Sequence, residues 1–454
     1  MKTTFDVRIW KIDVYKGTET TTYKVVWVVD GRRKKEPFKT AALAESFRSA
    51  LVTAARKGEA FDIESGRPVS MLRNDNTMSW YDFACKFVDM KWPHVAATTR
   101  RTHAEAMTAI TPALLTSTRG KPDDKLIRKA LSRWAFNTQQ RGAEDNPQDV
   151  ADALRWISRN TRPVSTLADP KVLRPLLNSL AVRLDGQPAA PSVVSRRRKI
   201  LNTSVEYAVE LKLLDANPIP ALKWKPPKAV QVVDRRAVPN PVQARTLINA
   251  VRFNVPSGAR LAAFFGCLYF AGMRPEEAVA LKLANLHLPK EGWGEFEFGE
   301  AEPHAGKEWT DSGENRDRRQ LKQREVGERR TAPCPPELTA LIHWHLEEFG
   351  TGAGGRLFVG ERNRNELPKR TITTTWRLAR EHVFISEVVE TPLAKRPYDL
   401  RHAAVSTWLN GGVPPTDVAL WAGQSVEVLF RIYAACLDKG TEILRRRVSA
   451  ALGY

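Results

Sequence analysis

The 454-residue sequence has few cysteines and no long apolar run. Its four cysteines, Cys85, Cys267, Cys334 and Cys436, lie far apart and form no CxxC pair. They provide no disulfide framework, which suits a reducing cytosol. A membrane-spanning helix would require a stretch of about eighteen apolar residues, and none is present. The N-terminus, MKTTFDVRIW, lacks the apolar core of a signal peptide, so we expect a cytoplasmic protein.

Acidic residues are scarce relative to basic ones. Lys and Arg number 71, Asp and Glu number 51, and the formal net charge is +20. Such an excess favours polyanionic partners, above all nucleic acid. Binding to a membrane surface is the competing use, but it calls for a basic amphipathic helix or a lipidation signal, and the sequence shows neither. The length exceeds one ordinary core, so we expect about two to four domains.

Residues 1–65 predict a small α+β domain with a three-stranded sheet. FDVRIWKIDVY and TYKVVWVVD are rich in β-forming residues, Asp30-Gly31 marks a hairpin turn, and GRRKKEPFK supplies a very basic third strand. One covering helix would leave the other sheet face exposed. We expect that face to be either a solvated charged surface or a DNA-binding surface that includes Arg32, Arg33, Lys34 and Lys35.

Helices are predicted next. Thr40 can cap the helix that covers the sheet, and its apolar residues Leu43, Phe47, Ala50 and Leu51 share a face. After a linker, ESGRPVSMLRNDNT at 64–77, apolar residues recur at helical spacing. We therefore expect an all-α domain at 76–223 with a cationic surface, whose basic residues are densest at Arg196, Arg197, Arg198 and Lys199.

A proline-rich segment, NPIPALKWKPPKAVQ, separates these helices from the rest. Its four prolines block regular pairing, and its lysines, Lys223 and Lys225 among them, suit an extended basic stretch that lies along DNA. We place a linker at 224–236 and a mainly helical domain with a small β-sheet at 237–454. In that domain 257–271 predicts an apolar helix, GEFEF predicts a strand, and LKQREVGERRTAP predicts a hairpin with Gly327 in its turn. The very polar stretch 301–320 interrupts the pattern.

Three stretches of the last domain carry groups that can act together. In FAGMRPEEAVALKL, Arg274 falls between a helix-ending glycine and a helix-opening proline, at a helix N-terminus where an anion is favoured. In RPYDLRHAAVSTWLNGG, Arg401 lies at the start of a helix. In WAGQSVEVLFRIYAAC, Tyr433 shares a helix face with apolar residues. The residues alone leave open whether Tyr433 is a core aromatic or a nucleophile.

Together these stretches resemble the tyrosine recombinase, or phage integrase, family. The resemblance rests on Arg274 within GMRPEE, Arg401-His402 within YDLRHAA, and Tyr433 nine residues after Gln424 of AGQS. In that family the sequences run roughly G-[LM]-R-x-x-E, then His-x-Leu-Arg-His, then Leu-Gly-His with a tyrosine nine residues later. The style is similar to integrases of actinobacterial phages and integrative elements. Residues 237–454 resemble the catalytic domain, 76–223 the core-binding domain, and 1–65 the arm-binding domain.

The resemblance implies a site-specific DNA recombinase that works through a covalent 3′-phosphotyrosine. Tyr433 would attack phosphorus, while Arg274 and Arg401 would hold the non-bridging oxygens, since guanidinium groups bind phosphate in a bidentate way. No metal and no cofactor are expected. Glu277 occupies the family's acidic position and should brace an arginine. His402 is either structural or a participant in the reaction.

A lysine on a β-hairpin protonates the leaving 5′-oxygen in that family. Lys322 is the expected counterpart and Lys307 the alternative, because a short hairpin positions a general acid better than a loose loop. Two positions depart from the pattern. Tyr398 stands where the family has His or Lys, and a phenol is a poor base at neutral pH. Gln424 stands where it has His or Trp, and its amide can donate to a phosphate oxygen but cannot take a proton.

We expect a homotetramer on double-stranded bacterial DNA, bound to core-type and arm-type attachment sites, with a possible excision factor and no membrane association. Tyr398 and Gln424 leave open a DNA-binding accessory protein without catalysis, and a type IB topoisomerase shares the chemistry. His343 and His345 lie two apart on an expected helix and point to different sides, so no metal site is expected there.

Overall fold

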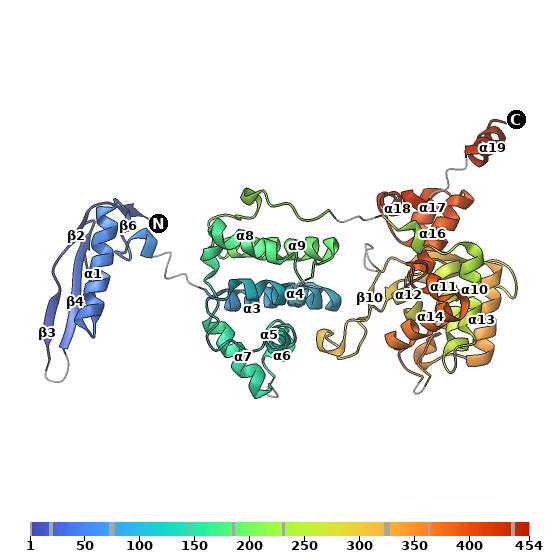
Figure 1. Ribbon diagram of the computed structural model, residues 1–454, viewed down its shortest axis with the longest axis horizontal. Helices are drawn as coiled ribbons and strands as arrows, with labels where there is room; N and C mark the ends of the chain where they lie inside the picture. The colour runs from blue at the N-terminus through green and yellow to red at the C-terminus, as the bar shows by residue number, and fades with distance from the viewer. Residues whose placement is uncertain are drawn as a thin grey trace. The chain divides into compact units, whose positions relative to one another are not determined.

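The computed structural model describes residues 2–17, 21–71, 78–143, 146–183, 187–228, 232–321, 327–361, 364–436 and 441–453. The chain is rich in helices and has small antiparallel sheets (Figure 1). One unit comprises Met1–Met90, Ala104–Thr138 and Glu144–Pro226, and the other comprises Lys91–His103, Gln139–Ala143 and Pro227–Tyr454. The boundary after Pro226 falls inside the segment predicted as a linker. Within the described ranges, no helix has both the length and the apolar character needed to cross a bilayer.

The N-terminal sheet has four strands, so the expectation of three was wrong. Ile9 lies opposite Trp27. Asp13, four residues after Ile9, lies opposite Lys24, which is only three residues before Trp27. The extra residue is a β-bulge, which divides the expected first strand in two. The strands are β2 (Val7–Ile9), β3 (Asp13–Lys16), the central β4 (Thr21–Val29) and β5 (Arg32–Phe38), and a separate pair joins β1 (Thr3–Thr4) to β6 (Phe61–Asp62).

Helix α1 (Ala41–Arg56) packs on this sheet. Thr40 caps it as predicted, since its side chain accepts a hydrogen bond from the backbone N–H of Leu43 at 3.3 Å. The predicted apolar face was wrong at two positions, because Ala50 is exposed and Leu43 is 56% exposed. The helix buries a partly different set of residues against the sheet. The buried residues of α1 are Ala44, Leu51 and Ala54.

The helices predicted between residues 79 and 223 are all present. Local chemistry sets several of their starts. Asp169 caps one helix by accepting from the backbone N–H of Lys171, and Pro170 occupies its first turn. The helices are α3 (Trp80–Lys91), α4 (Ala97–Ile110), α5 (Asp124–Ala130), α6 (Thr138–Arg141), α7 (Gln148–Arg159), α8 (Pro170–Ser179) and α9 (Pro191–Glu210).

The second unit is built around α11 (Gly258–Phe270), the apolar helix that the sequence predicts. Nearly all of its residues are buried, and it packs against four other helices, α10, α12, α13 and α16. GEFEF forms the central strand of a three-stranded sheet as predicted. The elements are α10 (Pro241–Val251), α12 (Pro275–Ala280), α13 (Pro336–Phe349), α14 (Lys369–Val383), α15 (Ser386–Val389), α16 (Asp399–Gly411), α17 (Pro415–Ala422), α18 (Val426–Tyr433), α19 (Thr441–Leu452), β7 (Leu286–His287), β8 (Gly294–Phe298) and β11 (Arg330–Cys334).

The hairpin predicted for LKQREVGERRTAP falls in part outside the described residues, which omit 322–326. β11 pairs with β8, whereas β10 (Arg319–Gln320) pairs with β9 (Glu300–Ala301), which follows β8 almost directly. Both flanks of the segment therefore pair with the chain at 294–301. Lys322 lies outside the described residues.

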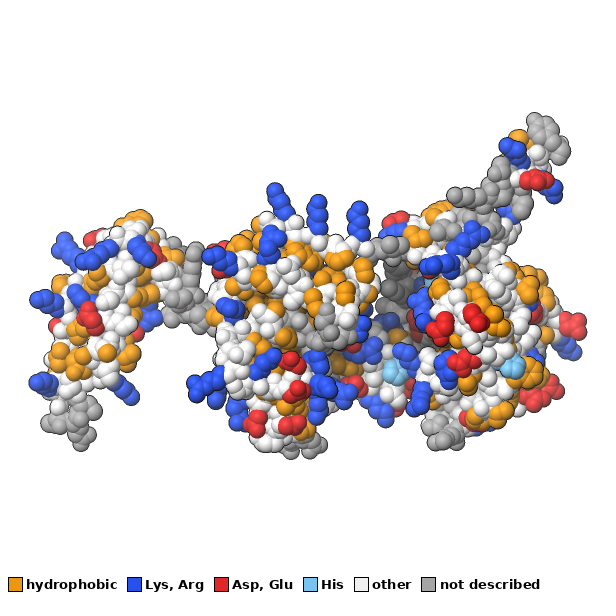
Figure 2. Space-filling model, in the orientation of Figure 1, with side chains coloured by type: hydrophobic (Ala, Val, Ile, Leu, Met, Phe, Trp, Pro, Cys, Tyr) orange, Lys and Arg blue, Asp and Glu red, His pale blue; other side chains and the backbone are white. Residues whose placement is uncertain are grey.

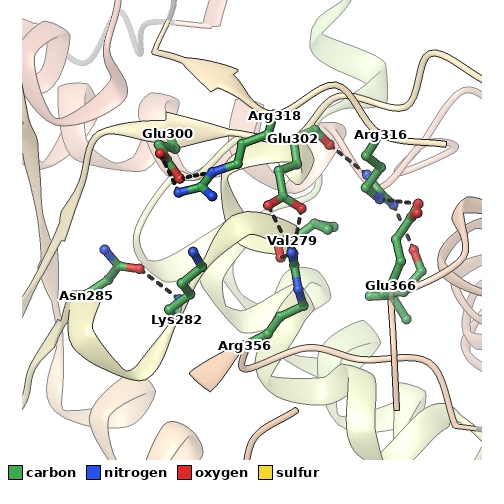
Figure 3. A network of polar contacts seen from close by, with 10 residues as sticks. Val279, Lys282, Asn285, Glu300, Glu302, Arg316, Arg318, Arg356 and Glu366 are labelled. Carbon is green, nitrogen blue, oxygen red and sulfur yellow. Dashed lines mark hydrogen bonds and ion pairs between the residues drawn. The ribbon is translucent and has the colours of Figure 1, made fainter. Parts of the chain in front are cut away.

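The polar stretch 301–320 is an ordered arm rather than a loose loop (Figure 3). Arg356 binds both oxygens of the Glu302 carboxylate, at 2.5 and 3.0 Å, and Glu302 is only 4% exposed. Arg316 forms an ion pair with Glu366 at 2.8 Å and donates to the backbone carbonyl of Glu302 at 2.9 Å. Arg318 binds Glu300 through two bonds of 2.7 Å. These charged side chains of the polar stretch are therefore paired.

Lys307 lies further out on this arm, in a short 3-10 helix at Lys307–Trp309. The neighbouring Trp309 is buried, and its ring lies 5.9 Å from that of Trp92. Arg100 donates to the backbone carbonyl of Trp309 at 3.0 Å and binds both oxygens of Asp311. The preference for Lys322 over Lys307 as the general acid assumed that Lys307 lies in a loose loop. Because the arm is ordered, that preference no longer holds.

Candidate functional site

Arg274 occupies the position between two helices that its neighbours predict. Gly272 follows α11 in the left-handed conformation, with φ of 57°, and Pro275 begins α12. A Cβ on Gly272 would lie 2.6 Å from the indole of Trp408, so glycine is required by contact as well as by backbone conformation. Arg274 is the N-terminal capping residue of α12.

A buried carboxylate holds Arg274 in place. Glu277 accepts from the Arg274 guanidinium at 2.7 Å and from its backbone N–H at 2.8 Å. The Glu277 side chain is 1% exposed. Burial opposes the charge, but Arg330 and Arg274 prevail and lower the pKa of Glu277 to about 2. These contacts agree with the bracing function expected for Glu277.

Arg330 completes this cluster and was missed from the sequence. Its guanidinium binds both oxygens of Glu277, at 3.0 and 2.8 Å, and its side chain is 1% exposed. Burial lowers the pKa of Arg330 to about 10, with Glu277 acting in the opposite direction. One signal was available in the sequence. Strand alternation places Arg330 on the same buried face as Ala332 and Cys334, where an arginine requires a carboxylate partner.

Arg401 joins the cluster from the first turn of α16. It is 1% exposed and donates to the backbone carbonyls of Gly272 and Ala422. Arg274 donates to the next carbonyl along, that of Gly423, at 2.6 Å. Two guanidinium groups therefore hold the turn that joins α17 to α18. The Nε atoms of Arg401 and Arg330 are buried and have no hydrogen-bond partner among the described residues.

Tyr433 ends α18, and its hydroxyl contacts the residue that follows Arg401. The residue is 2% exposed, and its Oη lies 2.9 Å from Nδ1 of His402. Burial raises the pKa of Tyr433, while Arg401 acts against this effect. Val405, Val418 and Leu429 share its apolar cluster, whereas Phe430 on the same helix is 45% exposed.

His402 lies between two phenol rings. Its ring centroid is 5.0 Å from that of Tyr398, edge to face, and 5.5 Å from that of Tyr433. Burial, together with Arg396 and Arg401, lowers the pKa of His402 to about 4. The imidazole is therefore neutral near pH 7 and can accept a hydrogen bond. Tyr398, the residue at the family's histidine position, contacts this imidazole.

Gln424 lies in the turn that the two arginines hold. Gly423 ends α17 with φ of 61°, and Ser425 caps α18 by accepting from the backbone N–H of Val428 at 3.2 Å. The Nε2 of Gln424 is buried and has no partner among the residues that the structure describes. An unpaired amide donor beside two arginines favours an anion at this position.

The four basic residues of the N-terminal sheet divide between its two faces. Arg32 and Lys34 lie opposite Val29 and Trp27, whose side chains belong to the core under α1, and Lys34 donates to the carbonyl of Glu64. Arg33 and Lys35 alternate to the other face. The open face also carries exposed aromatics and further cations, with Arg33 5.9 Å from the Trp10 ring and Lys24 5.2 Å from the Tyr15 ring. Figure 2 shows Lys and Arg side chains projecting from this part of the chain and from the helical part.

The other basic residues predicted to bind DNA also differ in their environment. Arg196 is exposed, and Arg198 is half-buried. Arg197 donates to the carbonyls of Leu180 and Val182, at 3.1 and 3.3 Å, so it holds the chain after α8. Lys223 and Lys225 are exposed, in the predicted linker. Arg197 is thus engaged within the protein, whereas the two lysines face solvent.

Among the described residues, no group of three or more His, Cys, Asp or Glu side chains could hold a metal ion.

In comparison with known proteins, no family model and no curated protein matches the sequence.

Solved structures give several matches of low identity. The Tn1549 transposon integrase in complex with a circular intermediate DNA is 10% identical, with a TM-score of 0.49 over 68% of this chain and 96% of that chain. The XerH site-specific recombinase bound to difH substrate is 12% identical, with a TM-score of 0.44 over 82% and 96%. Lambda integrase bound to DNA is 12% identical, with a TM-score of 0.39 over 73% and 94%. At these values the likeness assigns no residue and no activity. In structure, the chain is similar to integrases and site-specific recombinases.

Proposed function

We propose that this chain is a tyrosine recombinase, which cleaves and rejoins DNA at specific sites through a 3′-phosphotyrosine. One observation carries the proposal. Arg274 precedes Arg401 and Tyr433 by more than a hundred residues in sequence, yet Arg274 and Arg401 both donate to carbonyls of one turn. The Tyr433 hydroxyl contacts His402, the residue that follows Arg401. A phenol beside two permanently charged guanidinium groups suits attack on a phosphodiester.

The arrangement supports phosphoryl transfer without a metal ion. Negative charge develops on the non-bridging oxygens in the transition state, and preorganised cations stabilise it. Arg274 and Arg401 would supply that charge, and Gln424 would donate its unpaired Nε2–H to the same phosphate. Glu277 and Arg330 keep Arg274 in place. Because the covalent intermediate conserves the energy of the phosphodiester bond, rejoining needs no nucleotide cofactor.

DNA binding in this proposal uses basic surfaces outside the site. The open face of the N-terminal sheet combines cations with exposed aromatics, which suits contact with an arm-type site. Arg196 on α9 and the exposed lysines of the linker, Lys223 and Lys225, would contact the phosphates of a core-type site. Assembly as a tetramer on paired bacterial attachment sites, and integration of a mobile element, belong to the same proposal.

A DNA-binding protein without catalysis is the second candidate, and a specific observation favours it. Tyr433 and Arg401 are 2% and 1% exposed, so neither is open to a phosphate in this conformation. Tyr398 and Gln424 also replace the His or Lys and the His or Trp that the family carries at these positions. A protein that only occupies sites would tolerate both features.

Trapping of covalent complexes separates the two candidates. The full chain is incubated with nicked duplexes made from the DNA that flanks its gene, and protein–DNA adducts that survive SDS are isolated and sequenced. Wild type should give an adduct at a 3′-phosphate, and Tyr433→Phe should give none. Tyr269→Phe serves as the matched control, since Tyr269 is a buried tyrosine on α11, and should react like wild type. Tight binding with no SDS-resistant adduct would refute catalysis.

A further inference from the structure

We propose that His402 is the proton acceptor for Tyr433, an inference that rests on the proposed function. The geometry points to His402 because its Nδ1 lies 2.9 Å from the Tyr433 hydroxyl, within direct reach of the proton that must leave. From the sequence alone, His402 is either structural or a participant in the reaction, and no base for Tyr433 is predicted.

The other groups around the Tyr433 hydroxyl cannot take this proton. Arg274 and Arg401 are permanently charged cations. Tyr398 carries a phenol, which is a poor base at neutral pH. Cys436 is buried, and burial raises the pKa of its thiol, so it remains protonated and offers only a weakly accepting sulfur. Among these neighbours, His402 alone presents a basic nitrogen.

The surroundings of His402 suit this assignment. The positive charges of Arg396 and Arg401 and the burial of the ring all favour the neutral imidazole, so a lone pair is available for the phenol. The ring is fixed by packing between Tyr398 and Tyr433. His402 follows Arg401 in the first turn of α16, so the proton acceptor lies next to an arginine that would bind the phosphate. A DNA phosphate beside that arginine would add negative charge and favour the protonated imidazole.

The step balances in atoms and charge. The phenol proton moves to Nδ1 of His402 as the Tyr433 oxygen forms a bond to phosphorus and the bond from phosphorus to the 5′-oxygen breaks. The departing 5′-oxygen receives its own proton from a separate general acid. In the rejoining step, a 5′-hydroxyl gives its proton back to the deprotonated general acid as it attacks phosphorus. The imidazolium returns its proton to the departing phenolate.

A sulfur-substituted substrate tests this assignment. In a duplex with a bridging 5′-sulfur at the scissile phosphate, the thiolate leaves without protonation, so loss of a general acid is masked whereas loss of a base for Tyr433 is not. The variant is His402→Asn, whose amide keeps a hydrogen-bond acceptor but has no basic nitrogen, with His402→Gln as a second variant. The DNA is the sequence recovered from the wild-type adduct, and the readout is the single-turnover rate of adduct formation.

Both variants should bind the duplex like wild type and form the adduct at least roughly 100-fold more slowly, with oxygen and with sulfur at the 5′-position. His343→Asn is the matched control, because Nε2 of this half-buried histidine contacts the Pro289 carbonyl at 2.8 Å, and its rates should be unchanged. If the sulfur substrate restores the His402 variants, His402 serves the leaving group and the inference is overturned. Wild-type rates in either folded variant also overturn it, while the proposed function stands. If wild type itself forms no adduct, the proposed function fails and the inference fails with it.

Discussion

Replacement of Glu277 by glutamine should destabilise the second unit by about 3 kcal/mol at pH 7. The carboxylate is 1% exposed and binds two arginines, one of which is equally buried. A pKa of about 2 for Glu277, against an ordinary value of 4.5, corresponds to about 3 kcal/mol of interaction with the charged form. Loss of one partner from a buried ion pair costs about 3–5 kcal/mol in general, so the two lines of reasoning agree.

Cysteine labelling across a urea gradient can measure this effect within the full chain. Cys267 and Cys334 are fully buried in the core of the second unit, so their labelling reports its unfolding, whereas Cys85 in the first unit provides an internal reference. Glu337→Gln is the matched control, because Glu337 pairs with Arg245 at the surface, where a salt bridge contributes about 0–1 kcal/mol. The midpoint for Cys267 and Cys334 should fall in Glu277→Gln alone.

The effect of pH gives a second check on Glu277. Its folded-state pKa lies below the unfolded value, so its contribution to stability is complete above pH 4.5 and is lost as the pH falls toward about 2. The difference between wild type and Glu277→Gln should therefore shrink below pH 4.5. If Glu277→Gln lowers the free energy of unfolding at pH 7 by no more than Glu337→Gln does, the reasoning is refuted. Neither buried arginine would then depend on Glu277 for its charge.

Three further predictions follow from other residues. Gly423→Ala should destabilise the second unit and slow adduct formation, because a Cβ there would lie 1.9 Å from Nη1 of Arg330. Gly313→Ala, also at positive φ but with nothing within 4 Å, should cost only the backbone strain in the same urea titration. Gln424→His should preserve or raise the cleavage rate, and loss of a robust wild-type activity would contradict its placement beside the phosphate. Arg33→Ala should lower the salt dependence of DNA binding by about one phosphate contact, a slope change of about 0.9, in fluorescence titrations, whereas Arg32→Ala should change it less.

Local chemistry explains why some parts of the site could be predicted from the sequence. The Gly-Met-Arg-Pro order fixes Arg274 between two helices, since glycine permits the left-handed residue and proline suits a first helical turn. The spacing on α18 likewise placed Tyr433 on a buried face. These features depend on neighbours within a few residues. Their prediction therefore required no knowledge of the fold.

Long-range partners could not be predicted in the same way. Arg330 is 53 residues from Glu277, and no local pattern pairs them beyond the buried register of one short strand. The hydroxyl of Tyr433 meets His402 across 31 residues. The arm at 301–320 looked unstructured because its charges balance only once Glu302, Arg316 and their partners meet. In each case a pairing between distant segments decides the structure, and hydrophobic periodicity carries no information about it.

In the proposed function, the turn at Ala422–Gln424 would control access to the site. The carbonyls of Ala422 and Gly423 occupy donors of the two arginines that a phosphate would need. A hydrogen bond to a charged acceptor is roughly twice as strong as one to a neutral carbonyl, so a phosphate can displace them. Displacement would move the turn that precedes α18, and with it the helix that carries Tyr433. In the proposed function, DNA binding and exposure of the nucleophile are therefore a single structural change, which keeps the Tyr433 hydroxyl buried against His402 until a phosphate reaches the arginines.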